Sequence, residues 1–433
     1  MSATRHAVTT RSVLGIAVLA LSAVAAIGSP GAALAYDPTN SWINYALRGE
    51  RAPSYEAQSY DRSFVREGEA NPPRGYPTLS RDNIGPTKLA IKRYAQVVKN
   101  GDFPRVPAVQ LQRGSSGAEV AVLRERLTLS GDLREETSYP NSFDYYLEKA
   151  VKRFQASNGL TPTGIVDQRT RAALNVPAKV RLQQLRTNLS RLGQYVSGMP
   201  KRYVMVNIPA AQVEAVENNL VVSRHSGVVG KIDRKTPILT SAVHEMNFNP
   251  MWRLPPTVIH KDLIPKGRQM QRNGQSVLVK YGIDAYDGNG RKLDPEKVNF
   301  RSGMASGLRY SQKPGKDNPL GFLKINFHNA HSVYMHDTPS DSIFGRNFRA
   351  ASSGCIRVQG IEELAAWLLK DSGWSVSDVE RIKASGERKD VRLKRPVPLY
   401  FVYITAWATE DGLVQFRRDL YRRDGVGAVA SAY

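Results

Sequence analysis

The sequence predicts an α+β protein of several domains, and three observations support this. Short amphipathic segments separated by glycine-rich turns fill residues 108–177, a pattern typical of a small helical bundle. After Lys201 the texture changes to alternating or β-branched runs such as "RYVMVNIP" and "NLVVSRHSGVVG", which predict strands. The only cysteine, Cys355, lies in a Ser-Ser-Gly-Cys turn of this strand-rich part. We therefore expect a three-helix bundle followed by a β-rich domain.

The first 35 residues have the features of a secretory signal peptide. Arg5 and Arg11 precede an apolar run at 13–27 that is short for a membrane span, and "GAALA" offers a cleavage site after Ala35. An uncleaved membrane anchor is the alternative. Residues 36–80 are rich in Pro, Ser, Gly, Arg and Glu without any period, which predicts a disordered linker.

Length and charge limit the classes of partner. The chain has 433 residues and a formal net charge of +22, which is enough for two or three domains with a basic surface. A basic exported protein suits anionic polymers of the cell envelope, such as carboxylate-rich cell wall, teichoic acid or lipopolysaccharide. Nucleic acid would also suit the charge, but we find no nucleic-acid-binding motif and the export signal argues against it. No nucleic-acid partner is therefore expected.

The helical half divides into three segments. Residues 81–107 include "LAIKRYAQVVKNG", which predicts a helical scaffold segment that ends at Gly101. Residues 178–200 carry leucines at spacings of three and four and predict an amphipathic connector helix. Between them, the bundle at 108–177 has apolar stripes at Val120, Leu123 and Leu127 and again around Phe154.

Several motifs of this bundle resemble the peptidoglycan-binding-domain-1 family. They are the Arg-Gly-Ser-Ser-Gly entry, the "AVKRFQ" helix, the "GLTPTGIVDQRT" loop and the final "ALN". The resemblance implies that the bundle binds peptidoglycan. A three-helix scaffold without a ligand is the alternative.

The strand-rich part spans residues 201–425 and contains a polar, glycine-rich stretch at about 257–312. That stretch interrupts the strand pattern, so we read it as an insertion in the β domain that acts as a lid. Its composition suits a mobile segment, and lids exclude water from reactive intermediates.

Cys355 and His336 form a candidate pair for acyl transfer. A cysteine nucleophile acts as the thiolate, and an imidazole can take its proton while a third group orients the ring. In "SVYMHDT" the side chain of His336 should face the same way as Tyr334 at the end of a strand. Gly354 permits a tight turn, so its N–H and that of Cys355 can converge as an oxyanion hole. A thiolate paired with imidazole would titrate below its ordinary value of roughly 8.5.

The stretch "YMHDTPSDSIFGRNFRAASSGCIRV" resembles the signature of the L,D-transpeptidase (YkuD-type) family, and is closest to its large YcbB-like subfamily. "NPMWRLPPTVIHKDLIPK" and "QKPGKDNPLG" fit the same subfamily, over roughly residues 80–425. The resemblance implies a β-rich YkuD-type catalytic domain with Cys355 as nucleophile and His336 as proton donor and acceptor. Ser353 stands where many members of the wider family have histidine, although the YcbB-like branch also has serine there.

The resemblance also suggests roles for neighbouring residues. Arg357 would hold a substrate carboxylate or brace the loop, Tyr334 would line the pocket or pack in the core, and Ser353 would contact substrate. The family's third catalytic member is often a backbone carbonyl, and Asp337 or the loop near Ser352 is the candidate here.

The implied reaction takes place in the periplasm. Cys355 would attack the amide between diaminopimelate and the terminal D-Ala of a tetrapeptide stem, and an amine from a second stem would complete a 3→3 crosslink. Peptidoglycan is then both donor and acceptor, and outer-membrane or cell-wall proteins are further candidate partners. The sequence does not indicate an oligomeric state.

Other functions remain open at this point. Water as acceptor would make the same site an L,D-carboxypeptidase or an amidase, and a lysine acceptor would tether a protein to the wall. A wall-binding scaffold without activity would not need the His336–Cys355 pair. His328, His331 and His336 suggest zinc, but no second Cys or Glu cluster accompanies them. We therefore expect no metal and no cofactor.

Overall fold

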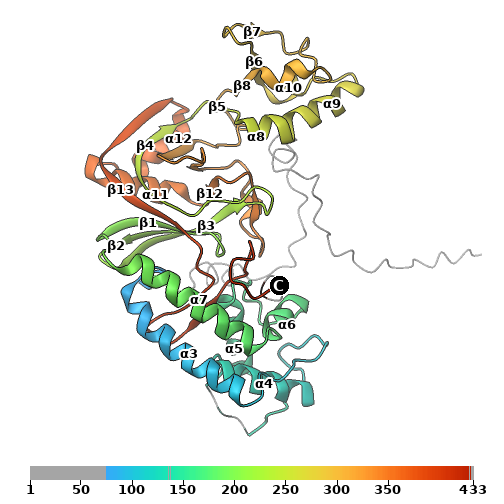
Figure 1. The fold of residues 1–433 in the computed structure, drawn as a ribbon, viewed down its shortest axis with the longest axis vertical. Helices are drawn as coiled ribbons and strands as arrows, with labels where there is room; N and C mark the ends of the chain where they lie inside the picture. The colour runs from blue at the N-terminus through green and yellow to red at the C-terminus, as the bar shows by residue number, and fades with distance from the viewer. Residues whose placement is uncertain (1–74, 135, 137, 429, 431–433) are drawn as a thin grey trace, which may run out of the picture. The chain divides into compact units, whose positions relative to one another are not determined.

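The computed structural model describes residues 75–134, 136, 138–428 and 430 (Figure 1). The predicted signal peptide at 1–35, and the predicted linker as far as residue 74, lie outside the described residues. Residues 77–80, which we also assigned to the linker, are buried, and the backbone and hydroxyl of Thr78 each donate a 2.9 Å hydrogen bond to the Glu214 carboxylate. These last residues are therefore part of the fold. Within the described ranges, no helix is long and apolar enough to cross a membrane.

The β-rich domain is built on a nine-stranded sheet in the order β11-β3-β12-β10-β9-β4-β13-β1-β2. A further pairing of β2 with β3 closes the sheet into a barrel-like layer. Its strands are β1 Arg202–Asn207, β2 Gln212–Glu217, β3 Leu220–Gly230, β4 Leu239–Phe248, β9 Leu323–Phe327, β10 Met335–His336, β11 Ala350–Ser352, β12 Ile356–Val358 and β13 Lys389–Val402.

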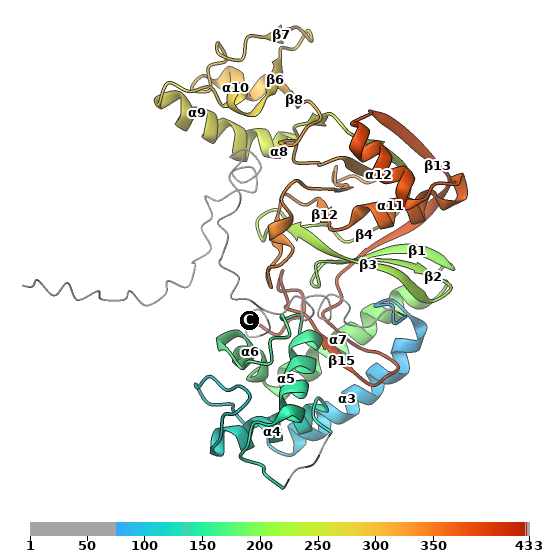
Figure 2. The same ribbon diagram turned by 180° about the vertical axis from the view of Figure 1, so that it is seen from behind.

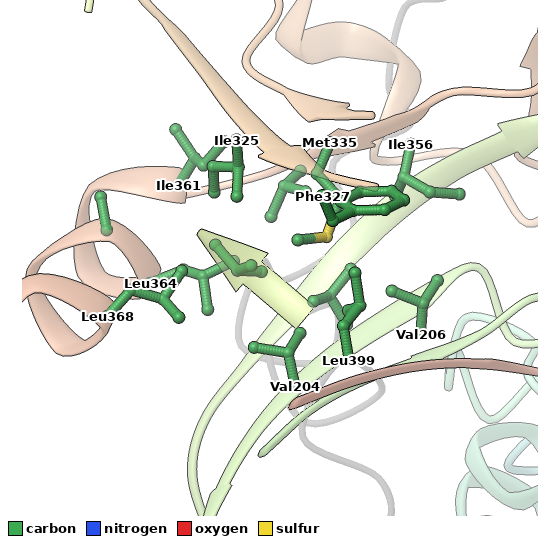
Figure 3. Close-up of a cluster of buried hydrophobic side chains, with 14 of the residues drawn as sticks. Val204, Val206, Ile325, Phe327, Met335, Ile356, Ile361, Leu364, Leu368 and Leu399 are labelled. Atoms are coloured by element: carbon green, nitrogen blue, oxygen red, sulfur yellow. The ribbon is translucent and has the colours of Figure 1, made fainter. Parts of the chain in front are cut away.

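Two helices cover this sheet and complete its core. They are α11 Ile361–Leu369, which forms from "GIEELAAWLL" directly after the cysteine turn, and α12 Val376–Ser385. Ser375 caps α12 through a reciprocal bond with Asp378, so this helix starts at a defined residue. Figure 3 shows the core that results, with members Val204, Val206, Ile325, Phe327, Met335, Ile356, Ile361, Leu364, Leu368 and Leu399. Burying each of these side chains contributes roughly 1.5–3 kcal/mol, so the core fixes the strands that carry the candidate site.

The bundle at 108–177 folds as three helices, as predicted: α4 Ala118–Ser130, α5 Tyr145–Ser157 and α6 Gln168–Leu174. Asp144 and Asp167 cap α5 and α6 by accepting hydrogen bonds from the backbone three residues later. The predicted apolar stripes meet in one core that includes Val120, Leu123, Leu127, Ala150, Val151, Phe154, Leu160, Ala173 and Leu174. The α+β class and its helical and β-rich parts are confirmed.

Two long helices and a C-terminal hairpin form the scaffold. A short 3-10 turn, η1 Arg81–Asn83, leads into α3 Ile84–Lys99, which packs along α7 Ala178–Val196 (Figures 1 and 2). The hairpin of β14 Ala406–Ala408 and β15 Val414–Phe416 packs on both helices and shares their apolar core. We assigned residues 406–416 to the β-rich domain, and apolar burial links them to both parts: Phe416 packs with the scaffold helices, and Trp407 packs with strand residues such as Tyr203.

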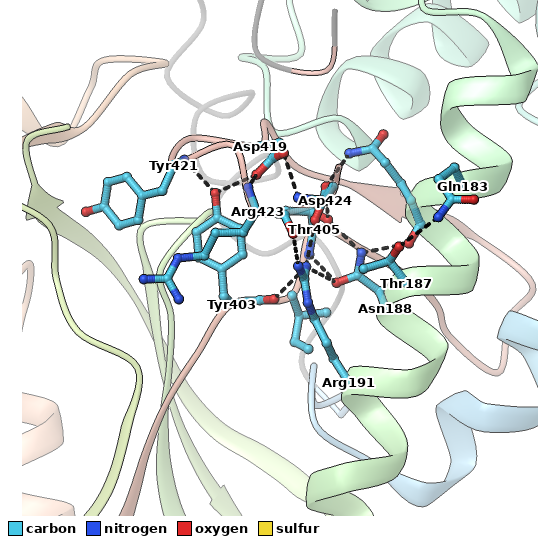
Figure 4. Close-up of polar contacts among 12 residues, drawn as sticks. Gln183, Thr187, Asn188, Arg191, Tyr403, Thr405, Asp419, Tyr421, Arg423 and Asp424 are labelled. Carbon is cyan, nitrogen blue, oxygen red and sulfur yellow. Dashed lines mark hydrogen bonds and ion pairs between the residues drawn. The ribbon is translucent and has the colours of Figure 1, made fainter. Parts of the chain in front are cut away.

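A buried polar network ties α7 to the C-terminal segment (Figure 4). Arg191 pairs with Asp424 at 2.6 Å, and the Asp424 side chain is fully buried. Asp424 also accepts a 2.7 Å hydrogen bond from Thr405, whose hydroxyl accepts one from Asn188 at 2.6 Å. A buried pair that loses one partner leaves an uncompensated charge, so this network holds the scaffold and the sheet together.

The insertion predicted at about 257–312 has a fold of its own, whose elements begin earlier, at Trp252, and end at Gln312. Its sheet, in the order β5-β8-β6-β7, comprises β5 Trp252–Arg253, β8 Arg309–Gln312, β6 Ile283–Tyr286 and β7 Lys292–Leu293. Its helical elements are α8 Pro256–Val258, the π-helix η2 Ile259–Leu263, α9 Ile264–Arg272, α10 Val277–Tyr281 and the 3-10 turn η3 Gly303–Gly307. An apolar cluster fills it, with Trp252, Leu263, Phe300 and Tyr310 all buried. The segment is polar in composition, yet it is organised around a core rather than being a loose loop.

Candidate active site

Two short parallel strands bring four polar side chains together. β10 and β12 pair Met335 with Ile356 and His336 with Arg357. Met335 and Ile356 point into the main core, so the alternation of side chains sends their neighbours to the opposite face. That face carries Tyr334, His336, Cys355 and Arg357.

These four side chains line one cavity of about 210 Å³. Its remaining walls come from the lid insertion and its flanks, from the cysteine turn and from the loop before β10: Trp252, Pro255, Pro256, Thr257, Val258, Leu320, His331, Ser332, Val333, Ser352 and Ser353. No acidic side chain is among these lining residues, while Arg357 adds a positive charge. The cavity therefore suits a substrate that presents a carboxylate.

The imidazole of His336 is buried and held in one tautomer. Its Nδ1 lies 2.5 Å from the backbone carbonyl of Asp337, so Nδ1 carries the proton and Nε2 is left as the acceptor. Burial, and then the charge of Arg357, lower the pKa of His336 to about 3. The ring is therefore neutral at physiological pH and can act as a base.

The Asp337 carboxylate does not orient the histidine. One of its oxygens accepts a 3.0 Å hydrogen bond from the backbone of Phe322, and burial raises the pKa of the carboxyl to about 6. The group that orients His336 is instead the main-chain carbonyl of the same residue. Of the two candidates for the third position, Asp337 is the one that contacts the ring, through its backbone carbonyl.

The thiol of Cys355 is protonated in this arrangement. Burial raises its pKa to about 11, although hydrogen bonds from Tyr334 and the charges of Lys324 and Arg357 act in the opposite direction. Our expectation of a lowered thiol pKa was therefore wrong, because loss of hydration outweighs the neighbouring cations. The neutral thiol and the neutral imidazole line the same cavity, so any proton transfer between them would accompany attack on the substrate.

The cysteine turn is braced by hydrogen bonds of its own. The Ser352 hydroxyl donates to the Cys355 carbonyl at 2.6 Å and accepts from the Gly354 N–H at 3.1 Å. Gly354 has φ +115°, a conformation that only glycine adopts readily. The Gly354 N–H already donates to the Ser352 hydroxyl. A role for this N–H in an oxyanion hole stays a prediction, and it requires Ser352 to release the N–H.

Three neighbours of the site escaped sequence analysis. Lys324 lies opposite His336 on β9, and its Nζ is 4.6 Å from the ring centroid of Tyr334. Trp252 shares a side-chain hydrogen bond with Tyr334 and belongs to the core of the insertion. The loop 231–236 lies against the cysteine turn, where the Thr236 hydroxyl donates to the Gly354 carbonyl at 2.9 Å. Of the three, only Trp252 lies in a motif noted in the sequence, "NPMWRLPP", which supported the family resemblance.

Two of the histidines that suggested zinc, His331 and His336, line the cavity, and the third lies elsewhere. His328 stacks on His244 with ring centroids 4.1 Å apart, whereas His336 faces the cavity. Within the described residues there is no group of three His, Cys, Asp or Glu side chains that would hold a metal ion.

Two parts of the chain are similar to known protein families. Residues 201–388 match the YkuD family, described as "L,D-transpeptidase catalytic domain", and residues 116–174 match the family described as "Putative peptidoglycan binding domain". A Haemophilus influenzae protein named "Putative L,D-transpeptidase" is 30% identical over 222 residues. That match covers 51% of this chain and 44% of the Haemophilus protein.

Two solved structures show a weaker likeness. An L,D-transpeptidase from Xylanimonas cellulosilytica is 18% identical, with coverage of 68% of this chain and 99% of that chain at a TM-score of 0.24. One from Stackebrandtia nassauensis is 11% identical, with coverage of 69% and 96% at a TM-score of 0.27.

Proposed function

We propose that this chain, which carries a YkuD-family L,D-transpeptidase catalytic domain at residues 201–388 and a peptidoglycan-binding module at 116–174, forms 3→3 crosslinks in peptidoglycan. The observation that carries the proposal is the array of Tyr334, His336, Cys355 and Arg357 in one cavity. It combines a nucleophile, a neutral base and a cation in a site without acidic groups.

The first half-reaction builds a thioester. His336 Nε2 takes the thiol proton as Cys355 Sγ attacks the carbonyl of the amide between diaminopimelate and D-Ala in a tetrapeptide stem. The tetrahedral intermediate collapses, the C–N bond breaks, and the imidazolium returns the proton to the departing amine of D-Ala. The Asp337 carbonyl supports this exchange because it stabilises the N–H of the imidazolium.

The second half-reaction transfers the acyl group to an amine. The acceptor amine of a neighbouring stem attacks the thioester and loses a proton to His336, which then reprotonates the departing thiolate. The raised pKa of Cys355 makes its thiolate a poorer leaving group, so the proton that His336 supplies to the departing sulfur is needed for this release. The lid insertion contributes Trp252 and Leu320 from its apolar cluster to the cavity wall, which would exclude water as a competing acceptor.

The binding module lies directly against the catalytic loop. The backbone N–H and the hydroxyl of Thr161 donate to the Asn347 side chain at 2.8 and 2.9 Å. Asn347 belongs to the loop between His336 and Cys355, so wall bound to the module would be presented beside the cavity. The predicted signal peptide would place this activity in the periplasm.

The test is mass spectrometry of purified disaccharide-tetrapeptides incubated with the protein. Crosslinked dimers with loss of one D-Ala are expected, and Cys355→Ala should form none. Tripeptides without dimers would instead indicate an L,D-carboxypeptidase with the same nucleophile. Adducts that appear only when a lysine-bearing protein is added would indicate tethering, and no change in any mixture would contradict all three activities.

A further inference from the structure

The cysteine turn is held by a loop of the β domain that follows β3. Lys231 donates its backbone N–H to the Ser352 carbonyl at 3.0 Å, and Thr236 donates its hydroxyl to the Gly354 carbonyl at 2.9 Å. Gly230 allows this close approach, because a Cβ there would lie 2.1 Å from the Arg234 carbonyl oxygen. The loop 231–236 is therefore a template for the turn.

Arg234 connects this loop to the cysteine turn and to the lid insertion at once. Its Nη1 donates to the Ser353 hydroxyl at 2.8 Å and to one Asp262 oxygen at 2.6 Å. Its Nη2 reaches the other Asp262 oxygen at 3.2 Å. The side chains of Arg234 and Asp262 are 9% and 1% exposed, so this two-pronged pair is shielded from water.

Asp262 belongs to the lid insertion and is anchored in it. It lies in the π-helix η2, and its neighbours Leu263 and Ile264 are buried in the apolar core of the insertion. Single π-turns inside helices frequently mark functional positions, since they redirect one side chain from the regular helical course. Here the redirected carboxylate faces the β domain rather than the core of the insertion.

Asp262 offsets the positive charges that surround the Arg234–Asp262 pair. The buried Lys231 also lies in this region. Burial, and then the charge of Arg234, lower the pKa of Lys231, while Asp262 and Asp233 raise it. Without the Asp262 carboxylate, these two cations would keep only the exposed Asp233, 3.5 Å from Arg234 Nε, as a counter-charge among the groups described here. The guanidinium would then turn toward water and release Ser353.

We propose that Arg234 is a positioning residue for acyl transfer, and that Asp262 holds it against Ser353 only while the lid insertion is closed. The pair fixes Ser353 and hence the backbone of Gly354 and Cys355, whose amides would face the developing oxyanion once Ser352 releases the Gly354 N–H. Closure of the insertion would thereby complete the site. The inference builds on the proposed function, but it concerns the geometry of the turn rather than the identity of the substrate.

Two reagents separate turn geometry from thiol reactivity. Acylation of Cys355 by 4-nitrophenyl acetate passes through an oxyanion, whereas alkylation by iodoacetamide does not. In Asp262→Asn and in Ser353→Ala, acylation should fall on the order of ten- to a hundredfold, because small misplacements of reacting groups cost that much. Alkylation should stay within about twofold in the same variants. Asp262→Glu, which keeps the charge, should recover part of the acylation rate.

A matched pair elsewhere in the domain provides the control. Arg202 and Asp371 pair at 3.0 Å away from the cavity, so Asp371→Asn should leave both rates unchanged. Ser353→Ala keeps the ion pair intact and provides a readout even if Asp262→Asn fails to fold. Equal acylation rates in wild type and Ser353→Ala, or parallel losses of both reactions, would overturn the inference. The variants could show the expected fall in acylation while the wild-type protein makes no crosslinks. That result would contradict the proposed function alone.

Discussion

His336 and Arg357 lie opposite each other on the parallel strands β10 and β12, with their side chains on the same face of the sheet. The guanidinium disfavours a second positive charge beside it, and it is the next cause after burial of the lowered pKa of His336. This cation therefore adds to burial in keeping the His336 ring neutral. Arg357 also lines the cavity, where the proposed function would use it to bind a substrate carboxylate.

Arg357→Gln should raise the pKa of His336. Loss of the positive neighbour favours the imidazolium, but burial persists, so the value should stay below the ordinary 6.5. NMR titration of the His336 ring protons measures it directly. Arg357→Lys is the control, because it keeps the charge and should keep the pKa low. An unchanged value in the glutamine variant would show that burial alone sets the protonation state.

Alkylation of Cys355 should increase steadily with pH. Its pKa of about 11 means that the thiolate fraction rises roughly tenfold per pH unit from neutrality to about pH 10. Rates of iodoacetamide adduct formation, followed by intact-protein mass spectrometry, provide the profile. Cys355 is the only cysteine in the chain, so Cys355→Ala should form no adduct. A plateau reached below pH 8 would instead indicate a thiolate paired with imidazolium.

His336→Ala should slow acylation of Cys355 by a factor on the order of a hundred, as expected for loss of a general base. The measurement is release of 4-nitrophenol from 4-nitrophenyl acetate near neutral pH. At pH 10, where the solvent deprotonates the thiol, alkylation of the same variant should stay close to the wild-type rate. His328→Ala is the control, since His328 stacks on His244 outside the cavity. Equal acylation with and without His336 would exclude it as the base.

Asn347→Ala should separate wall binding from wall crosslinking. The substitution removes two hydrogen bonds to Thr161 but leaves the core of the binding module intact. Sedimentation with purified sacculi should therefore be unchanged, while crosslinking of intact sacculi should fall several-fold. Turnover of soluble muropeptides should not change, because they reach the cavity without the module. Asn219→Ala, on the β2–β3 turn, is the surface control, and a loss of crosslinking in both variants would contradict the coupling.

Local patterns in the sequence predicted the parts of the site that lie on one strand or one turn. The alternation in "SVYMH" predicts that Tyr334 and His336 share a face, and both line the cavity. Lys324 and Arg234 could not be found this way, because pairing between distant strands brings them to Cys355. The spacing of residues within one segment does not predict which distant strands will pair.

The limits of composition are clearest in the lid insertion and the C-terminal hairpin. The insertion looked mobile because glycine and polar residues dominate its count, yet a few large side chains such as Trp252 and Phe300 build a core. The hairpin at 406–416 continues the strand texture of the β domain but buries Phe416 against α3 and α7. In both cases the structure depends on packing against residues that are distant in the same sequence.

The Asp337 carboxyl should make the protein less stable as the pH rises. Its folded-state pKa is about 6, above the unfolded value of roughly 3.9. Between these two values the folded state binds more protons than the unfolded state, so the free energy of unfolding falls with increasing pH. Asp337→Asn removes this titration, and an amide oxygen can still accept the hydrogen bond from Phe322. Relative to wild type, the variant should therefore gain about 2–3 kcal/mol between roughly pH 4 and pH 7.

Urea unfolding of wild type and Asp337→Asn across this pH range measures the gain. Asp378→Asn is the matched control, because Asp378 is an exposed carboxylate whose hydrogen bonds to Ser375 lower its pKa to about 2. Asp378 stays ionised in both folded and unfolded states above about pH 5, so its variant should differ from wild type by a nearly constant amount there. The same flat difference for Asp337→Asn would mean that the Asp337 carboxyl is ionised in the folded protein throughout. In that case the backbone of Asp337 would still orient His336, but beside a fixed negative charge that favours the imidazolium.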